Sequence, residues 1–186
     1  MISDIDDTIK ITEVRDRHAA LRNTFLREFQ AVPGMAEFYQ TLGRSNHAAV
    51  HYISASPQQL YEPLAAFVRS NGFPAGTFTL KEFRWKDKSF FSLFANPEQY
   101  KSGVIEPLMK QFPNRKFILI GDSGERDPEI YARLAREYPQ QIARIFIRDV
   151  TGEPAASERY VKAFRDVPPE RWQVFRVPDE LKVASE

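Results

Sequence analysis

The hydrophobic residues of this chain fall into two patterns, which predict two kinds of secondary structure. Short continuous apolar runs bounded by polar residues are typical of buried strands. The clearest is the run Phe-Ile-Leu-Ile-Gly within residues 116–121. Weaker runs of the same kind predict further strands at residues 2–6, 47–54, 77–80, 142–147 and 172–177. A short β-branched stretch at residues 9–12 is also expected to be extended.

Between most of these runs the apolar positions recur at helical spacing. They predict helices at residues 16–30, 35–42, 56–71, 97–112 and 128–137. Asp16 suits the N-cap of the first helix, and Gly43 is expected to end the second. Because strands alternate with helices, we expect an α/β domain whose mostly parallel sheet is covered by helices on both faces.

The length of 186 residues favours a single domain over residues 1–186. A domain of this size buries roughly 70% of the surface that its unfolded chain exposes, so it needs no disulfide or structural metal to fold. Only Met1, Ile2 and Ser3 precede an acidic run, whereas a buried strand usually has about four to eight residues. The first strand is therefore either very short or shortened at its N-terminus.

Composition removes several classes of function. The chain has no cysteine, which excludes disulfides, thiolate metal sites and cysteine nucleophiles and fits a reducing compartment such as the cytoplasm. A formal net charge of +1 gives no overall attraction to nucleic acid, and we expect no nucleic-acid partner. No apolar run approaches the roughly 20 residues of a membrane span. His18, His47 and His51 show no metal-ligand spacing.

The acidic run at the end of the first predicted strand is the first candidate for chemistry. Asp4, Asp6 and Asp7 crowd three carboxylates into four positions. Two carboxylates ~4 Å apart repel each other by about 4 kcal/mol at an effective dielectric constant of 20. A fold accepts such a cluster if a cation neutralises it or if the groups point apart into water. Taken alone, the run is equally consistent with a solvated turn.

Asp122 favours the cation. It follows the buried run at 116–121, so its carboxylate is expected at the same edge of the sheet as Asp4. Carboxylate oxygens of this kind suit Mg²⁺, which usually binds one or two carboxylates together with a phosphate. We therefore expect Mg²⁺ as the cofactor. Asp127 precedes Pro128 at the start of a helix, and we interpret it as an N-cap.

Three further side chains suit the binding of phosphate. Ser54 ends its predicted strand with a hydroxyl donor, and Lys101 lies on the helix that leads to Asp122. A hydroxyl and an ammonium can hold phosphoryl oxygens while charge shifts in the transition state. Arg148 follows the strand at 142–147 and is a third candidate, although an ion pair with Asp149 explains it equally well.

The order Asp-x-Asp-x-Thr, strand-end Ser, Lys, Gly-Asp resembles the four motifs of the haloacid dehalogenase (HAD) superfamily. Residues 3–10 (Ser-Asp-Ile-Asp-Asp-Thr-Ile-Lys), 53–60, 116–131 and 147–150 further resemble the catalytic domain of the actin-patch phosphatidate phosphatases, with lipins as more distant relatives. The stretch Gly-Asp-Ser-Gly-Glu-Arg-Asp-Pro-Glu is the most specific part. The resemblance spans residues 2–150 and implies a HAD-like (Rossmannoid) three-layer sandwich with a small cap or none.

The resemblance also implies a role for each residue of the motifs. Asp4 would be the nucleophile that forms an aspartyl-phosphate, and Asp6 the general acid and base. Mg²⁺ would be held by a carboxylate oxygen of Asp4, the backbone carbonyl of Asp6, and Asp122. Ser54 and Lys101 would bind the phosphoryl oxygens. Asp7 stands where other HAD phosphatases often have glycine, and we assign it an indirect, water-mediated contact to the metal.

The expected reaction is Mg²⁺-dependent hydrolysis of phosphatidate to diacylglycerol. Basic and aromatic residues interleave at 81–94, which suits peripheral contact with an anionic membrane, although packing of these aromatics into the fold explains the same pattern. A HAD phosphatase acting on a soluble phosphate ester, or a weakly catalytic lipid-phosphate-binding module, would share the motifs. A phosphoreceiver module is disfavoured, because there the lysine follows the last acidic residue.

Overall fold

A computed structural model describes residues 1–82 and 97–181 of the chain. Within them a sheet of six parallel strands has the order β3-β2-β1-β4-β5-β6. The strands are β1 (Ile2–Asp4), β2 (Val50–Pro57), β3 (Gly76–Lys81), β4 (Phe117–Asp122), β5 (Ile142–Arg148) and β6 (Trp172–Phe175). The α-helices are α1 (Arg17–Phe25), α2 (Met35–Ser45), α3 (Tyr61–Ser70), α4 (Pro97–Gln111), α5 (Asp127–Glu137) and α6 (Glu158–Ala163). Short 3₁₀ turns are η1 (Gln58–Leu60), η3 (Pro169–Arg171) and η4 (Pro178–Glu180).

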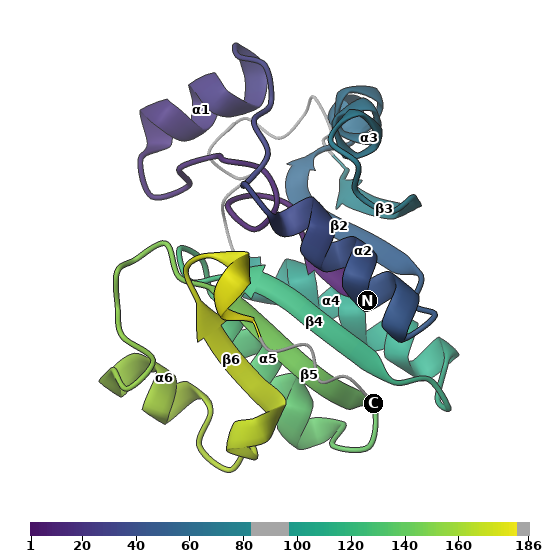
Figure 1. The fold of residues 1–186 in the computed structure, drawn as a ribbon, viewed down its shortest axis with the longest axis vertical. Helices are drawn as coiled ribbons and strands as arrows, with labels where there is room; N and C mark the ends of the chain where they lie inside the picture. The colour runs from purple at the N-terminus through teal and green to yellow at the C-terminus, as the bar shows by residue number, and fades with distance from the viewer. Residues whose placement is uncertain (83–96, 182–186) are drawn as a thin grey trace.

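The sheet separates two hydrophobic cores, as alternation along the strands requires. In β4, Ile118 and Ile120 face the core beneath α2 and α3, whereas Phe117 and Leu119 face the core beneath α4, α5 and α6. Figure 1 shows α2 in front of the sheet and α4 and α5 behind it. The predicted three-layer α/β architecture with a parallel sheet is confirmed.

The first strand is short but central. All three residues of β1 are buried, and they pair on one side with β2, where Asp4 is in register with Ile53. On the other side Ile2 is in register with Leu119 of β4. Neighbours on both sides supply the backbone hydrogen bonds that so short a strand could not hold alone. The pairing of β1 with β2 and β4 therefore fixes the backbone of the strand that ends at Asp4.

Several predicted boundaries were wrong. β2 continues to Pro57, so the helix expected from residue 56 begins as α3 only at Tyr61, after η1. The helix α2 passes through Gly43 and ends at Ser45. Residues 9–12 form no strand, although Lys10 makes isolated bridges to Asp6 and Ala31. The helix α6 was not predicted.

The segment between β1 and α2 carries the small helix α1. Its N-cap is Asp16, as predicted, and the Asp16 carboxylate accepts hydrogen bonds from the backbone N–H of His18 and Ala19. The helix ends at Phe25, earlier than expected. Figure 1 places α1 beyond the edge of the sheet at which β4 and β5 end, which is where a small cap would lie.

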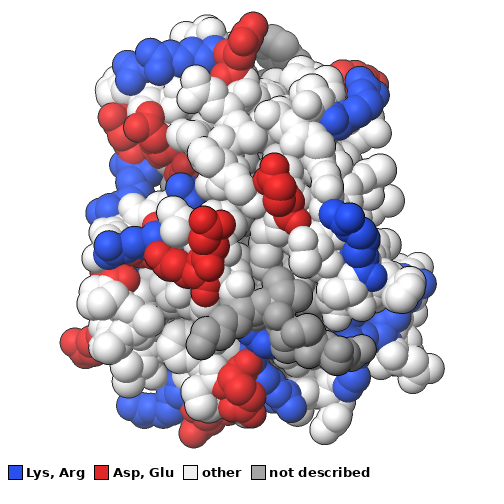
Figure 2. Space-filling view, viewed as in Figure 1, with Lys and Arg blue, Asp and Glu red and all other residues white. Residues whose placement is uncertain are grey.

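The surface carries both signs of charge. Acidic and basic side chains intermingle over the face in Figure 2, as the near-zero net charge predicts. Among residues 1–82 and 97–181, no helix is long and apolar enough to span a bilayer. Most of the segment 81–94 (residues 83–94) lies outside the described residues, so its predicted membrane contact stays a prediction.

Candidate active site

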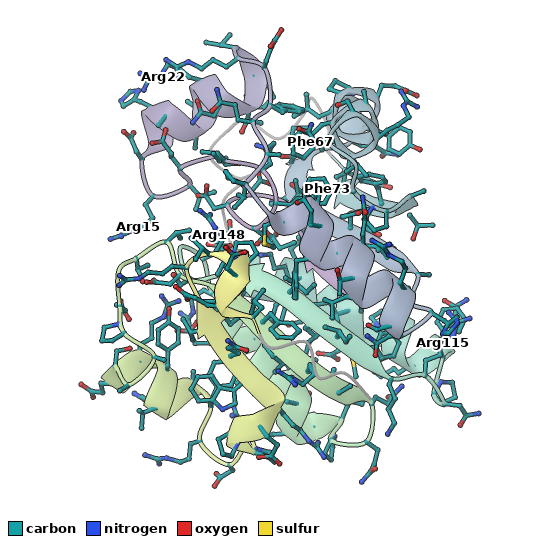
Figure 3. All side chains as sticks on the ribbon, in the orientation of Figure 1. Arg15, Arg22, Phe67, Phe73, Arg115 and Arg148 are labelled. Carbon is teal, nitrogen blue, oxygen red and sulfur yellow. The ribbon has the colours of Figure 1, made fainter. Side chains whose placement is uncertain are left out.

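Parallel strands bring the predicted residues to one edge of the sheet. Asp4 and Asp122 are the last residues of β1 and β4, and Ser54 lies in β2 just before a register shift. The strand order reverses direction between β1 and β4, and crevices at such switch points are where ligands bind in open α/β sheets. Figure 3 places Arg148 on this side of the sheet, with Arg115 at the opposite end.

Lys101 of α4 is the cationic centre of the site. Its side chain is 1% exposed, and its Nζ lies 2.8 Å from Asp4 Oδ1, 2.9 Å from Glu125 Oε2 and 2.5 Å from Asp127 Oδ1. Burial alone would lower the pKa of Lys101, but these carboxylates raise it well above its usual value. Lys101 therefore stays protonated in the fold.

One lysine does not balance the acids around it. Carboxylate oxygens of Asp4, Asp122 and Asp127 lie within 4.8 Å of one another, and all three side chains are buried. Burial raises the pKa of each carboxyl; Lys101 opposes this rise, and the neighbouring acids reinforce it. Oδ2 of Asp122 is buried without a hydrogen-bond partner among the described residues.

These observations test whether a divalent cation fits the site. Hard carboxylate oxygens, an excess of buried negative charge and an unpaired oxygen on Asp122 all suit Mg²⁺ or a similar ion. Burial raises the pKa values of the three aspartates, and a cation there would offset the mutual repulsion that raises them further. The donor set therefore fits the metal that the sequence predicts.

Asp127 belongs to this cluster, and its prediction as an N-cap was wrong. The N-cap of α5 is Arg126, and Asp127 is the first residue of the helix. Its carboxylate accepts hydrogen bonds from Lys101 Nζ and, at 3.2 Å, from the backbone N–H of Asp122. Gly121 allows this approach, because a Cβ at that position would lie 2.2 Å from Asp127 Oδ2.

Asp6 lies beside the cluster in a different environment. Its Oδ1 contacts Lys10 Nζ at 2.9 Å and Thr12 Oγ1 at 2.8 Å, and its Oδ2 accepts a hydrogen bond from Ser54 Oγ at 2.6 Å. Burial alone would raise the pKa of Asp6, but Lys10 and these hydrogen bonds lower it to about 2. Asp6 is therefore ionised in this arrangement, and the Ser54 hydroxyl donates to it.

Asp7 and Arg148 organise the loop around Asp6. The Asp7 carboxylate accepts hydrogen bonds from three consecutive backbone N–H groups, those of residues 12–14, at 2.7–2.8 Å. Arg148, half-buried at the end of β5, donates from Nη1 to the Asp7 carbonyl at 2.6 Å. Asp149 is paired instead with Arg176, at 3.1 Å. Arg148 thus supports the loop backbone, and its predicted phosphate contact stays a prediction.

Sequence reasoning missed three site residues that the structure brings in. Lys10 and Thr12 contact Asp6, and Glu125 contacts Lys101. Glu125 lies inside the most specific motif, so its position was a usable signal. Lys10 closes the matching segment 3–10, but its residue type alone gave no reason to place it in the site, and Thr12 lies outside every matching segment.

Comparison with known proteins finds a matching family model and two curated relatives. The family model for the catalytic domain of phosphatidate phosphatase APP1 matches residues 1–149. Phosphatidate phosphatase APP1 of Saccharomyces cerevisiae is 40% identical over 152 residues, which cover 80% of this chain and 25% of that protein. The uncharacterized protein C29B5.04c of Schizosaccharomyces pombe is 32% identical over 157 residues, 82% of this chain and 25% of that protein. The chain thus spans about a quarter of the length of these relatives.

Among solved structures, the D,D-heptose 1.7-bisphosphate phosphatase from B. bronchiseptica, complexed with magnesium and phosphate, superposes with a TM-score of 0.51. The match covers 96% of this chain and 92% of that one at 11% sequence identity. At so low an identity the likeness concerns the fold, and it confirms the predicted HAD-like architecture.

Proposed function

This chain belongs to the family of the phosphatidate phosphatase APP1 catalytic domain, and from that premise we propose that it hydrolyses a lipid phosphate monoester, phosphatidate, to diacylglycerol and phosphate. The observation that carries the proposal is the buried cluster of Asp4, Asp122, Asp127 and Lys101 at the carboxyl edge of the sheet. A buried lysine among buried carboxylates is costly to maintain for stability alone, and such clusters gather at functional sites.

Asp4 and Asp122 would hold Mg²⁺, together with the backbone carbonyl of Asp6. When bound, the ion would offset the repulsion between the Asp4 carboxylate and the phosphate of the substrate. Asp127 would hold Lys101 and the Asp122 backbone in place rather than bind the ion, because its two oxygens already accept hydrogen bonds from these groups. Lys101 would then hold both Asp4 and a phosphoryl oxygen.

The proposed reaction has two steps. A carboxylate oxygen of Asp4 attacks phosphorus, the bond from phosphorus to the alcohol oxygen breaks, and Asp6 gives its proton to the departing alkoxide. Water then attacks phosphorus in the aspartyl-phosphate, Asp6 takes a proton from that water, and Asp4 and phosphate are released. Before the first step Asp6 must gain a proton. The hydrogen bond from Ser54 to Asp6 helps to keep the pKa of Asp6 low. When the Ser54 hydroxyl donates to a phosphoryl oxygen instead, protonation of Asp6 becomes easier.

The decisive experiment compares phosphate release from phosphatidate in mixed micelles by the wild type and by Asp4→Asn, with Mg²⁺ and after chelation. We expect Asp4→Asn to lose at least about 10³-fold in rate, because the amide cannot attack phosphorus. The control is Asp166→Asn, the same chemical change at an exposed loop position, which should keep full activity. Equal rates for the wild type and Asp4→Asn would end the nucleophile assignment.

The substrate class needs its own measurement. A soluble phosphate ester would use the same catalytic residues, so a panel of sugar phosphates is assayed beside phosphatidate under identical conditions. We expect the highest kcat/KM on phosphatidate. Hydrolysis of sugar phosphates with none of phosphatidate would overturn the lipid assignment and leave the phosphatase assignment standing.

A further inference from the structure

Lys10 is a buried lysine that the proposed reaction does not use. Its side chain is fully buried, and its Nζ lies 2.9 Å from Asp6 Oδ1 and 2.6 Å from Thr12 Oγ1. The ammonium also lies over the ring of Phe29, 5.0 Å from the ring centroid. Because an unpaired buried ammonium is strongly destabilising, Lys10 and Asp6 depend on each other for compensation.

Thr12 closes a three-membered network with this pair. Its hydroxyl accepts from Lys10 Nζ and donates to Asp6 Oδ1 at 2.8 Å, so a single hydroxyl uses both its donor and an acceptor position. The backbone of Thr12 is fixed in turn, since its N–H donates to Asp7 Oδ1 at 2.8 Å. Lys10, Thr12 and Asp6 are therefore held by one short loop.

The two oxygens of Asp6 are held differently. Oδ1 forms an ion pair with Lys10 and accepts a hydrogen bond from Thr12, and both residues belong to the loop that follows Asp6 in the chain. Oδ2 receives Ser54 Oγ at 2.6 Å, with Ser56 Oγ at the limit of bonding, 3.5 Å away. A serine hydroxyl has one hydrogen to donate. When the Ser54 hydroxyl donates its hydrogen bond to a phosphoryl oxygen, Oδ2 of Asp6 loses its close partner. Oδ1 keeps both Lys10 and Thr12.

We propose that Lys10 and Thr12 are positioning residues that fix Asp6 through Oδ1, so that Oδ2 gives the proton to the departing alkoxide and takes one from the attacking water. This inference rests on the proposed function, in which Asp6 is the acid and base. Asp6 can turn about its side-chain torsions, and the network removes that freedom on the side away from Ser54. The carboxyl group then meets the leaving oxygen in one orientation, which is what efficient proton transfer requires.

The test uses two esters that differ in their need for a proton. An alkyl phosphate such as phosphatidate loses a strongly basic alkoxide, whereas p-nitrophenyl phosphate loses a weakly basic phenolate that leaves unprotonated. Lys10→Met should lower kcat/KM for the alkyl ester at least about 10-fold, because a positioned acid contributes about 10²–10⁴. It should lower kcat/KM for the aryl ester less than about 3-fold. The value of kcat/KM reports only the steps up to the aspartyl-phosphate, so the later role of Asp6, taking a proton from water, does not affect it.

Two further variants keep the inference open to refutation if Lys10→Met folds poorly. Thr12→Val keeps the shape of the side chain and the ammonium of Lys10, and should show the same selective loss in smaller measure. Lys10→Arg keeps the charge and should recover part of the alkyl-ester activity. Lys116→Met changes an exposed lysine and should alter neither rate.

The outcomes separate the two proposals. A fall of equal size on both esters in Lys10→Met and Thr12→Val would show general structural damage and overturn the inference, as would unchanged rates on both. A wild type that hydrolyses neither ester would overturn the proposed function, and the inference with it. An active wild type with a loss confined to the alkyl ester supports both.

Discussion

Replacing Gly121 with alanine should damage both stability and activity through a single clash. A Cβ at residue 121 would lie 2.2 Å from Asp127 Oδ2 and 2.8 Å from Asp127 Cβ and Cγ. These distances are too short for any side chain, and Asp127 is fully buried at the start of α5. The Asp127 carboxylate must therefore move away from Lys101 and from the Asp122 backbone.

The size of the effect follows from two contributions. Forcing an extra methyl group into a packed interior costs about 1–3 kcal/mol. A weakened hydrogen bond to a buried ammonium costs about 1.5–3 kcal/mol, but Lys101 keeps Asp4 and Glu125 as partners, so the lower end applies. The sum is about 3 kcal/mol, which for a domain of this size corresponds to a fall of about 6–12 °C in Tm.

Thermal unfolding followed by circular dichroism measures this change, with phosphate release as the second readout. The matched control is Gly103→Ala in α4, where a Cβ would meet nothing within 4 Å. That variant should be unchanged or more stable by up to about 1 kcal/mol, because alanine favours helix over glycine. A Tm for Gly121→Ala within about 2 °C of the wild type would refute the account of the Asp127 contact.

Two further perturbations follow from the contacts described, and a third follows from the sequence of residues 81–94. Asp7→Ala leaves the backbone N–H groups of residues 12–14 without their acceptor and should lower the unfolding free energy by about 2–3 kcal/mol, measured by urea denaturation; an unchanged midpoint would contradict it. Burial would raise the pKa of Asp149, but hydrogen bonds, first those from Thr151, lower it. The stability that ionised Asp149 gives the folded protein is therefore fully present above the unfolded pKa of about 3.9, and it is lost as pH falls through the lower folded pKa. The advantage of wild type over Asp149→Asn should shrink below about pH 4 in urea titrations, and a constant difference would refute it. The double variant Lys86→Glu/Lys88→Glu should pellet less with anionic liposomes, and pelleting equal to the wild type would remove the predicted membrane contact.

The sequence predicted the site residues that lie at the ends of strands. Asp4 and Asp122 follow short buried runs, and in a parallel sheet the carboxyl ends of such strands share one edge, so their proximity followed from pattern alone. The role of β1 was harder to judge, because only three residues precede Asp4. Pairing with β2 and β4 on both sides supplies rigidity that no local pattern reveals.

Contacts between individual side chains in the folded interior could not be predicted in the same way. Asp127 looked like a helix cap because its neighbours are Pro128 and a helical pattern, and only the close packing over Gly121 shows its true partners. Lys10 gave no sign of burial, since a lysine is usually exposed unless paired. Asp127 contacts Lys101, which lies 26 positions earlier, and Lys10 is buried beside Asp6 and Phe29 only in the folded chain.

The central place of β1 also has a consequence for folding kinetics. The sheet registers Ile2 with His51 on one side and with Leu119 on the other. The second pairing joins segments far apart in the chain, and contacts of long sequence separation form slowly. Neither half of the sheet alone supplies both neighbours of β1, so Asp4 reaches its final position only when the two halves meet. We expect refolding chains to regain helix signal before they regain catalysis.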